Sequence, residues 1–220
     1  MTQLGALAER IQRVRQQIAD VGGRDVQILA VTKGHPIEVV REARAAGLQA
    51  IGENYAQELV GKFADAPPDV AVHFIGQLQT NKVRLIVDLV DVYETLDRPA
   101  LVVELAKRAP GAHVLVQVNT TGEASKGGCK PGEAESLVTR AASAGLVVDG
   151  LMTVGPTTGG PEAARPGFRA VRSLCETLGL ATCSMGMSDD FVVAVQEGST
   201  RVRLGSVLFG MRPVAAPRVR

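Results

Sequence analysis

A closed (β/α)8 barrel, also called a TIM barrel, is the fold class that this sequence predicts, on three observations. Eight short apolar runs alternate with amphipathic stretches along the 220 residues. Alternating strands and helices form a parallel sheet, and eight such repeats in this length fit a compact barrel. Glycine and proline cluster only in connections, so we expect a single domain over residues 1–220. A doubly wound open sheet is the alternative, which periodicity alone does not exclude.

The first element is predicted to be an extra helix ahead of the barrel. Apolar residues recur there in steps of three and four, at Leu4, Leu7, Ile11, Val14, Ile18 and Val21. This spacing places them on one face of a helix. Gly22 and Gly23 follow and would end the helix, because glycine readily adopts the backbone conformation of a helix stop.

Eight runs rich in apolar and β-branched residues are predicted to be buried strands. In chain order they cover residues 26–33, 48–52, 70–76, 90–96, 112–119, 146–153, 181–186 and 200–206. Helices are predicted over residues 36–46, 54–63, 81–89, 99–109, 132–144, 164–178 and 189–197. Because the strands of such a barrel present their carboxyl ends on one face, we searched those ends for functional groups.

Composition excludes several classes of protein. The chain has 24 Lys+Arg against 23 Asp+Glu, and only 3% of its residues are aromatic. A nucleic-acid-binding surface needs excess positive charge and aromatic side chains for stacking, so we expect no nucleic acid partner. No apolar run approaches the ~20 residues that cross a bilayer, and we expect no signal peptide, because charges interrupt the opening segment every few residues. Three cysteines cannot all pair within the chain, which suits a reducing cytoplasm.

Lys33 is the first candidate for chemistry. It ends the first predicted strand, in AVTKGHP, and alternation along the strand places it in phase with Leu29 and Val31. A lysine at the rim of an apolar barrel is partly desolvated, which favours the neutral amine that forms a Schiff base with an aldehyde. The residue pattern also allows a surface lysine that merely closes a strand.

Two glycine-flanked turns near the end of the chain are candidates for phosphate binding. SMGMSDD (184–190) is a predicted strand–turn–helix junction with Ser188 as helix N-cap, and Ser206 directly follows Gly205 in GSTRVRLGSVLFG. Glycines let backbone N–H groups approach an anion, and barrels frequently hold phosphate after strands seven and eight. Asp189 and Asp190 would repel an anion unless they point into solvent. Ordinary turn glycines and capping serines are the alternative.

Three further polar residues follow strand ends or lie on the last strand. Arg201 and Arg203 share one side of the eighth predicted strand, so one of them could reach the barrel mouth and donate to a ring nitrogen. A pair of solvent-facing arginines is the alternative. Asn54, in GENYAQE, is either a cavity residue or a helix N-cap. The three histidines are too dispersed for a metal site, so we expect no metal.

Seven motifs in order along the chain carry a resemblance to a known family. They are AVTKGHP, IGENYAQE, HFIGQLQTNK, VNTTGEASKGG, GLMTVGP, SMGMSDDFVVAV and GSTRVRLGSVLFG. Together they resemble the pyridoxal phosphate homeostasis protein family, whose members are similar to the barrel domain of alanine racemase and bind pyridoxal 5′-phosphate. The resemblance covers nearly the whole chain, and its most specific part is SMGMS together with GSTRVRLG.

The resemblance implies a set of cofactor-binding residues. They are Lys33, Asn54, Met187, Ser188, Arg203, Gly205 and Ser206. Lys33 would be the Schiff-base lysine, Asn54 would line the cofactor face, and Arg203 would face the pyridine nitrogen. The other four would hold the phosphate, and Arg201 receives no role. Two departures from the family pattern, Gly34-His35 and YETLDR (93–98), leave the outer wall of the pocket undefined.

The resemblance implies a carrier of the cofactor rather than an enzyme. A racemase needs a second acid or base on the opposite face of the bound cofactor. In enzymes that resemble alanine racemase, a tyrosine from a second domain takes this role, and we expect no such domain before Arg220. The tyrosines of this chain are Tyr55 and Tyr93, and neither is expected to replace it. An arginine opposite the ring nitrogen also favours an unprotonated nitrogen and a weaker electron sink.

We therefore expect a cytoplasmic monomer that holds pyridoxal 5′-phosphate as a Schiff base on Lys33 and passes it to apo-enzymes. Its role would be intracellular homeostasis of pyridoxal phosphate, a form of vitamin B6. Neither nucleic acid nor a membrane is an expected partner. Two alternatives stay open. One is a weakly active pyridoxal phosphate-dependent amino-acid racemase, and the other is a lysine-imine aldolase that acts on a phosphosugar.

Overall fold

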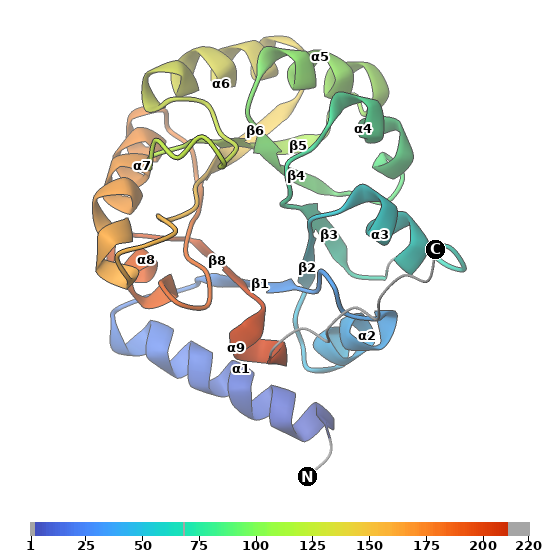
Figure 1. Cartoon of the computed structure of the whole chain (residues 1–220), viewed down its shortest axis with the longest axis vertical. Coiled ribbons are helices and arrows are strands. Elements are labelled where there is room, and N and C mark those ends of the chain that lie inside the picture. The colour runs from blue at the N-terminus through green and yellow to red at the C-terminus, as the bar shows by residue number, and fades with distance from the viewer. Residues whose placement is uncertain (1–2, 68, 211–220) are drawn as a thin grey trace.

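The computed structural model describes residues 3–67 and 69–210, and within them eight parallel strands close into a barrel (Figure 1). The strands are β1 Gln27–Val31, β2 Ala50–Glu53, β3 Ala71–Phe74, β4 Val92–Leu96, β5 His113–Gln117, β6 Val147–Met152, β7 Thr182–Ser184 and β8 Arg201–Leu204. Each strand pairs with its neighbour in sequence, and β8 pairs with β1, so that Leu29 lies opposite Arg203. The closed barrel is confirmed, and the open sheet is excluded.

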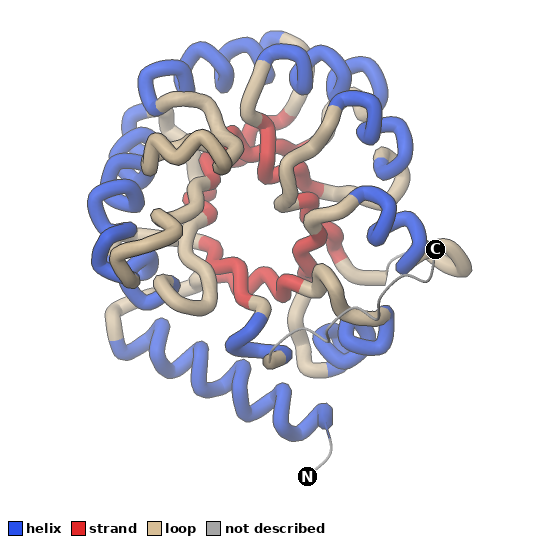
Figure 2. Tube along the Cα trace, in the orientation of Figure 1, coloured by secondary structure: helices blue, strands red, loops and turns tan. Residues whose placement is uncertain are grey.

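Helices surround the ring of strands (Figure 2). They are α1 Gln3–Asp20, α2 Ile37–Ala45, α3 Ala56–Lys62, α4 Thr80–Ile86, α5 Pro99–Arg108, α6 Ala134–Ser143, α7 Arg165–Thr177, α8 Phe191–Gln196 and α9 Ser206–Phe209. Short 3-10 turns cover Pro131–Glu133 and Pro161–Ala164. Every predicted helix has a counterpart, and α9 is an addition that the sequence did not indicate.

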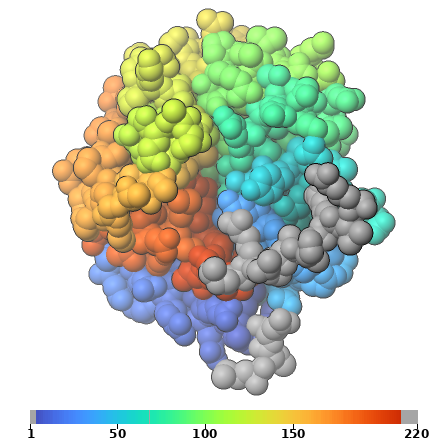
Figure 3. Space-filling view, viewed as in Figure 1, coloured from blue at the N-terminus to red at the C-terminus, as the bar shows by residue number. Residues whose placement is uncertain are grey.

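The extra N-terminal helix α1 is present and packs on the barrel through the apolar face that the spacing predicts. Leu7, Ile11, Val14 and Ile18 are buried, whereas Leu4 is 42% exposed. Arg10 of α1 donates from Nη1 to the main-chain carbonyl of Leu208 in α9, at 2.9 Å. Figure 3 shows the blue α1 directly against the red last described segment. Helix α1 therefore supports α9.

Strand β1 ends at Val31, so the prediction that Lys33 belongs to the strand is wrong by two residues. The chain leaves the sheet in a turn, in which the His35 N–H donates to the Thr32 carbonyl at 3.0 Å. Gly34 has a φ of 73°, a left-handed conformation that favours glycine. Lys33 therefore lies in the β1–α2 turn.

Strand β8 likewise ends at Leu204, two residues before the predicted boundary, because Ser206 begins α9. No helix of the described residues is long and apolar enough to cross a membrane. Residues 1–2, 68 and 211–220 lie outside the description, so the single domain over residues 1–220 stays a prediction.

Candidate functional site

A cavity of about 650 Å³ opens where β1, β2, β3, β6, β7 and β8 end. It is lined by all seven residues that the sequence singled out: Lys33, Asn54, Met187, Ser188, Arg203, Gly205 and Ser206. The other lining residues are Val31, His35, Ile75, Val154, Asp189 and Gly210. The sequence analysis gave none of these six a role in cofactor binding. Val31, Ile75 and Val154 lie at or within two residues of a strand end, which is the signal that could have found them.

Lys33 reaches the cavity from the β1–α2 turn, between two residues that are held firmly. It is half-buried, and Thr32 before it is fully buried. The Thr32 N–H donates to the Gly52 carbonyl of β2 at 3.1 Å, which extends the β1–β2 pairing by one bond. The Gly34 N–H donates to Glu58 Oε1 of α3 at 2.6 Å. A primary amine at the mouth of the barrel is the group that attacks a carbonyl carbon.

Asn54 brings an unsatisfied acceptor to the cavity. Its Oδ1 atom is buried and has no hydrogen-bond partner among the described residues. The alternative interpretation of Asn54 as a helix N-cap is wrong, because α3 begins at Ala56 and Tyr55 occupies the N-cap position. A buried amide oxygen without a partner costs free energy, and a donor on a bound ligand would offset that cost.

The β7–α8 turn is ordered by a carboxylate rather than by Ser188. Helix α8 begins at Phe191 with Asp190 in the N-cap position, so the prediction that Ser188 caps this helix is wrong. Asp190 is buried, and its Oδ1 accepts from the Met187 N–H at 2.6 Å. Burial raises the pKa of Asp190, and the Met187 N–H and the charge of Arg203 oppose this shift. Asp189 is exposed at the rim.

Ser188 instead joins the two glycine-flanked turns. Its Oγ accepts from the Val207 N–H of α9 at 3.3 Å, which leaves the Ser188 hydroxyl hydrogen available to a ligand. Gly205 lines the cavity, and a Cβ added there would lie 3.4–3.8 Å from atoms of Val31, an ordinary contact distance. Backbone N–H groups can approach an anion closely at such a position.

Arg203 is buried in the barrel floor of the cavity and held in one orientation. Its Nη1 donates to Ser184 Oγ at 2.9 Å, and its Nη2 donates to the Thr153 carbonyl at 2.6 Å. Burial lowers the pKa of the Arg203 guanidinium, and the negative charges of Glu94 and Asp190 work in the opposite direction. Arginine remains a donor under these conditions, so Arg203 offers a fixed hydrogen-bond donor to a ligand ring.

Glu94, which the sequence analysis did not single out, organises the barrel interior beneath Arg203. It is fully buried, and its Oε2 accepts from Ser184 Oγ at 2.6 Å. Its Oε1 accepts from Arg201 Nη1 at 3.0 Å and lies 2.7 Å from His73 Nδ1. Burial alone would raise the pKa of Glu94, but His73, Arg201 and Arg203 lower it to about 2.

The two arginines of β8 thus differ in surroundings. Arg201 pairs with Glu94 and also donates to Gln27 Oε1, so it does not line the cavity. The alternative interpretation of Arg201 and Arg203 as a solvent-facing pair is wrong, because the Arg203 residue is 4% exposed and the Arg201 side chain is 13% exposed.

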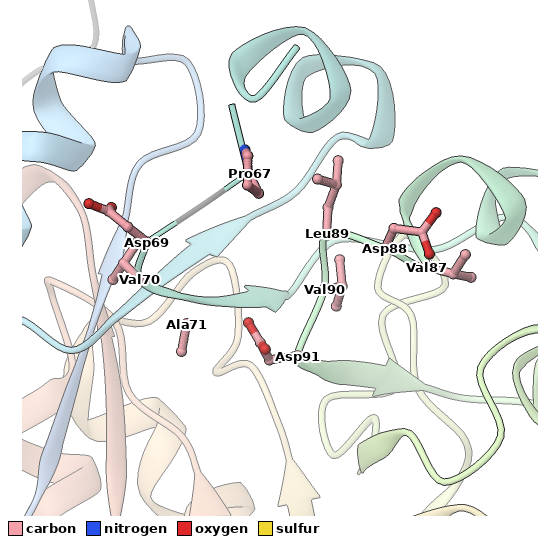
Figure 4. Close-up of a pocket in the computed structure, with 9 residues that line it drawn as sticks. All are labelled: Pro67, Asp69, Val70, Ala71, Val87, Asp88, Leu89, Val90 and Asp91. Atoms are coloured by element: carbon pink, nitrogen blue, oxygen red, sulfur yellow. The ribbon is translucent and has the colours of Figure 1, made fainter. Parts of the chain in front are cut away.

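Another cavity, of about 510 Å³, lies at the amino ends of β3 and β4, away from all seven predicted residues. Figure 4 shows its walls, which include the carboxylates of Asp69, Asp88 and Asp91. Asp91 Oδ2 accepts from the Val72 N–H at 2.7 Å and so anchors the start of β3. Such a wall repels anions. Among the described residues, no group of His, Cys, Asp and Glu could hold a metal ion.

The donors of the first cavity fit a small phosphorylated aldehyde. Lys33 supplies the amine, and the turns at Ser188 and Gly205 supply hydroxyl and backbone donors that line the cavity. Arg203 supplies a fixed donor for a ring, and Asn54 supplies an acceptor that still needs a donor. The fold and the site thus define a (β/α)8 barrel with a lysine-containing cavity at its carboxyl end.

Comparison with known proteins narrows this class. The family model described as alanine racemase, N-terminal domain, matches residues 2–213. The chain belongs to the family of pyridoxal phosphate homeostasis proteins, as its similarity to curated members shows. It is 40% identical over 228 residues to the pyridoxal phosphate homeostasis protein of Pseudomonas aeruginosa, and the match covers 97% of this chain and 99% of that protein.

Two further comparisons agree with this family membership. The chain is 41% identical over 221 residues to the pyridoxal phosphate homeostasis protein of Aquifex aeolicus, with coverage of 95% of this chain and 96% of that protein. It is also similar to PipY of Synechococcus elongatus, whose structure was solved with pyridoxal phosphate (PLP) bound. That match has a TM-score of 0.81 and 31% identity, and it covers 93% of this chain and 100% of that chain.

Proposed function

We propose that this protein binds pyridoxal 5′-phosphate in the 650 Å³ cavity, holds it as a Schiff base on Lys33 and releases it to apo-enzymes. The observation that carries this proposal is that one cavity gathers the lysine, the arginine and both glycine-flanked turns. The names of the relatives and the bound structure of PipY support it. The function is then homeostasis of pyridoxal phosphate, in which a bound store limits the free aldehyde.

Each of the seven residues that the sequence singled out has a task in this proposal. The amine of Lys33 binds the aldehyde carbon, and Arg203 donates to the pyridine nitrogen. Ser188, Ser206 and the backbone beside Gly205 and Met187 hold the phosphate. The unsatisfied Oδ1 of Asn54 accepts a hydrogen bond from the ring hydroxyl of the ligand. When bound, the cofactor supplies an electrophilic aldehyde and a ring that can withdraw electrons.

The geometry favours a carrier over an enzyme. Arg203 keeps its proton and donates it in a hydrogen bond, which leaves the ring nitrogen unprotonated and weakens electron withdrawal. Neither tyrosine of the chain is among the described lining residues. Tyr93 is buried in β4, and Tyr55 is 55% exposed at the N-cap of α3. A tyrosine is therefore not placed to serve as the second acid or base that a racemase needs.

The setting of this function is also a proposal. We propose that the protein acts in the cytoplasm as a monomer, in contact with apo-enzymes that accept the cofactor. The reducing cytoplasm suits three cysteines that are free and buried.

The test is the near-visible spectrum of the purified protein loaded with pyridoxal 5′-phosphate, before and after borohydride. We expect a yellow protein whose cofactor becomes fixed to Lys33, as identified by peptide mass spectrometry. Lys33→Ala should abolish the adduct, whereas the control Lys82→Ala, which changes a lysine of α4 outside the cavity, should retain it. An adduct found chiefly on Lys82 or Lys126 would contradict the assignment, and a colourless protein would favour a phosphosugar aldolase.

A further inference from the structure

A buried lysine lies behind the β1–α2 turn and has no place in the proposed function so far. Lys62 ends α3, and its side chain is 4% exposed. Its Nζ donates to Glu53 Oε1 at 2.5 Å, to the Thr32 carbonyl at 2.9 Å and to Glu58 Oε1 at 3.2 Å. One ammonium group thus joins α3, the end of β2 and the residue before Lys33.

The same cluster holds the residues on both sides of Lys33. On one side, the Thr32 carbonyl accepts a hydrogen bond from Lys62 Nζ, and the Thr32 hydroxyl donates to Glu53 Oε1 at 2.6 Å. On the other side, the Gly34 N–H donates to Glu58 Oε1 at 2.6 Å. Lys33 between them lines the cavity. The cluster therefore fixes the backbone on both sides of Lys33 through contacts with α3 and the end of β2.

Stability alone does not explain this arrangement. Burying a lysine and a carboxylate costs free energy that their attraction rarely exceeds, and apolar side chains of similar volume commonly do as well. The cost is visible at Glu53, whose Oε2 has no partner among the described residues. Burial raises the pKa of Glu53, and Lys62 opposes that shift. Holding a reactive group within about 0.5 Å of its productive position, by contrast, requires a supporting shell of hydrogen bonds of this kind.

We propose that Lys62 and Glu58 are positioning residues for Lys33, an inference that rests on the proposed function. They fix the carbonyl of Thr32 and the N–H of Gly34, so that the amine of Lys33 meets the aldehyde of pyridoxal 5′-phosphate. Glycine has the widest backbone freedom of any residue type, and the hydrogen bond from the Gly34 N–H to Glu58 restrains the backbone of Gly34. Without that bond the turn can adopt other conformations, and the amine loses its fixed position.

The experiment compares Glu58→Ala with Glu58→Gln and with the control Gln57→Ala. Glu58 is partly exposed, so its variants should fold, and Gln57 is an exposed neighbour on the same helix. The readouts are the rate at which the near-visible band forms with pyridoxal 5′-phosphate and the fraction that borohydride fixes to Lys33. We expect Glu58→Ala to slow attachment about tenfold, as the loss of a charge-assisted hydrogen bond predicts. Glu58→Gln should recover part of the rate, because an amide oxygen still accepts from Gly34, and Gln57→Ala should match the wild type.

A second measurement separates positioning from a general structural role. In a Lys33→Ala background the same Glu58→Ala change should leave the affinity for non-covalent pyridoxal 5′-phosphate unchanged, because nothing remains to be positioned. Lys62→Met combined with Glu53→Gln removes the buried charges together, so that neither is left unpaired. We expect this double variant, once shown to fold by circular dichroism, to attach the cofactor more slowly than the wild type.

The outcomes are distinct. Attachment at the wild-type rate in Glu58→Ala and in the double variant would overturn the positioning role and leave the proposed function intact. An affinity loss from Glu58→Ala that persists in the Lys33→Ala background would show a structural role instead, and would also overturn it. Absence of any Lys33 adduct in the wild type would overturn the proposed function, and the positioning role with it.

Discussion

At the scale of single residues, Gly205 is the position where a small change should separate folding from phosphate binding. An added Cβ would touch Val31 at ordinary distances, so Gly205→Ala should fold. In the proposed function, the same Cβ would occupy space through which the phosphate approaches the backbone of this turn. We expect Gly205→Ala to weaken binding of pyridoxal 5′-phosphate more than Ser188→Ala or Ser206→Ala. Each serine variant should lose only about 1–2 kcal/mol of binding free energy, because backbone N–H groups would still bind the phosphate.

The measurement is the ratio of affinities for pyridoxal and for its phosphate ester, by fluorescence titration or calorimetry. Wild type should prefer the ester strongly, and Gly205→Ala should lose much of that preference while binding pyridoxal as before. Equal affinity of the wild type for both compounds would mean that these turns form no phosphate site.

Glu94 gives a second expectation at this scale, for the dependence of stability on pH. Its pKa in the folded protein is lowered from 4.5 to about 2, so the folded state favours the carboxylate. The resulting stabilisation is fully present above about pH 4.5 and is lost as the pH falls toward 2. The loss is about 3 kcal/mol at most, from the free energy that corresponds to each unit of pKa.

Urea unfolding of wild type and Glu94→Gln at several pH values between 6 and about 3 tests this expectation. The excess free energy of unfolding of the wild type should shrink as the solution becomes more acidic. Burial raises the pKa of Glu53, so Glu53 makes the free energy of unfolding change with pH in the opposite direction. Both proteins contain Glu53, so its contribution cancels when the free energy of unfolding of one is subtracted from that of the other. A constant difference over this range would contradict the expectation.

At the scale of elements, α1 should contribute to the site although it does not touch the cavity. Ile11 is 3% exposed in the face that packs on the barrel, and the neighbouring Arg10 donates to Leu208 of α9. We expect Ile11→Ala to lower the free energy of unfolding by about 2–5 kcal/mol, through lost burial and a residual cavity. Binding of pyridoxal 5′-phosphate should weaken at the same time, because α9 begins at Ser206.

Urea unfolding and ligand titration of Ile11→Ala measure both effects. Gln12→Ala is the matched control, since Gln12 is exposed on the opposite face of the same helix. Unchanged stability of Ile11→Ala would show that α1 only lies against the barrel, and unchanged binding would show that α9 keeps its place without α1.

Element order was predictable from the sequence, but element ends were not. Strands and helices follow from the spacing of apolar residues, which depends on neighbours only a few positions apart. The ends of β1 and β8 depend on turns instead. Lys33 leaves the strand because Gly34 turns the chain, and Ser206 begins α9 because Gly205 interrupts the apolar run. An apolar run that continues as VLFG gives no sign of where strand becomes helix.

At the scale of the whole molecule, the cavity was predictable but its supporting contacts were not. Strand ends meet on one face of a barrel, so residues such as Asn54 and Arg203 could be assigned to one place from the fold class and the resemblance alone. The roles of Glu94 and Lys62 were not predictable, because they depend on which side chains meet in space. Glu94 meets its partners inside the barrel, and Lys62 joins α3 to the end of β2 and to the residue before Lys33. Contacts such as that of Ser184 with Glu94, 90 residues apart, leave no pattern in a single sequence.

The choice between a carrier and an enzyme depends on groups that come from across the whole molecule. Proton transfer on both faces of a bound amino acid needs two positioned groups, and general acid–base catalysis typically supplies about 10²–10⁴-fold in rate. Arg203→Glu should favour a protonated ring nitrogen, yet we do not expect it to create an efficient racemase. The opposite face would still lack its tyrosine, because Tyr93 is buried and Tyr55 does not line the cavity.

The assay for this last expectation incubates cofactor-loaded protein with L-alanine in deuterated water, and follows α-proton exchange by NMR and enantiomer ratio by chiral chromatography. Cofactor occupancy is measured alongside, because Arg203→Glu also removes the proposed contact between Arg203 and the ligand. We expect slow exchange without racemisation, which fits a Schiff base with a base on one face only. Transfer of cofactor from the loaded protein to an apo-enzyme should proceed in the same solution. Racemisation at ordinary enzyme rates that disappears in Lys33→Ala would show instead that the barrel is an amino-acid racemase, with the exposed carboxylate of Asp189 at the rim as the first residue to substitute.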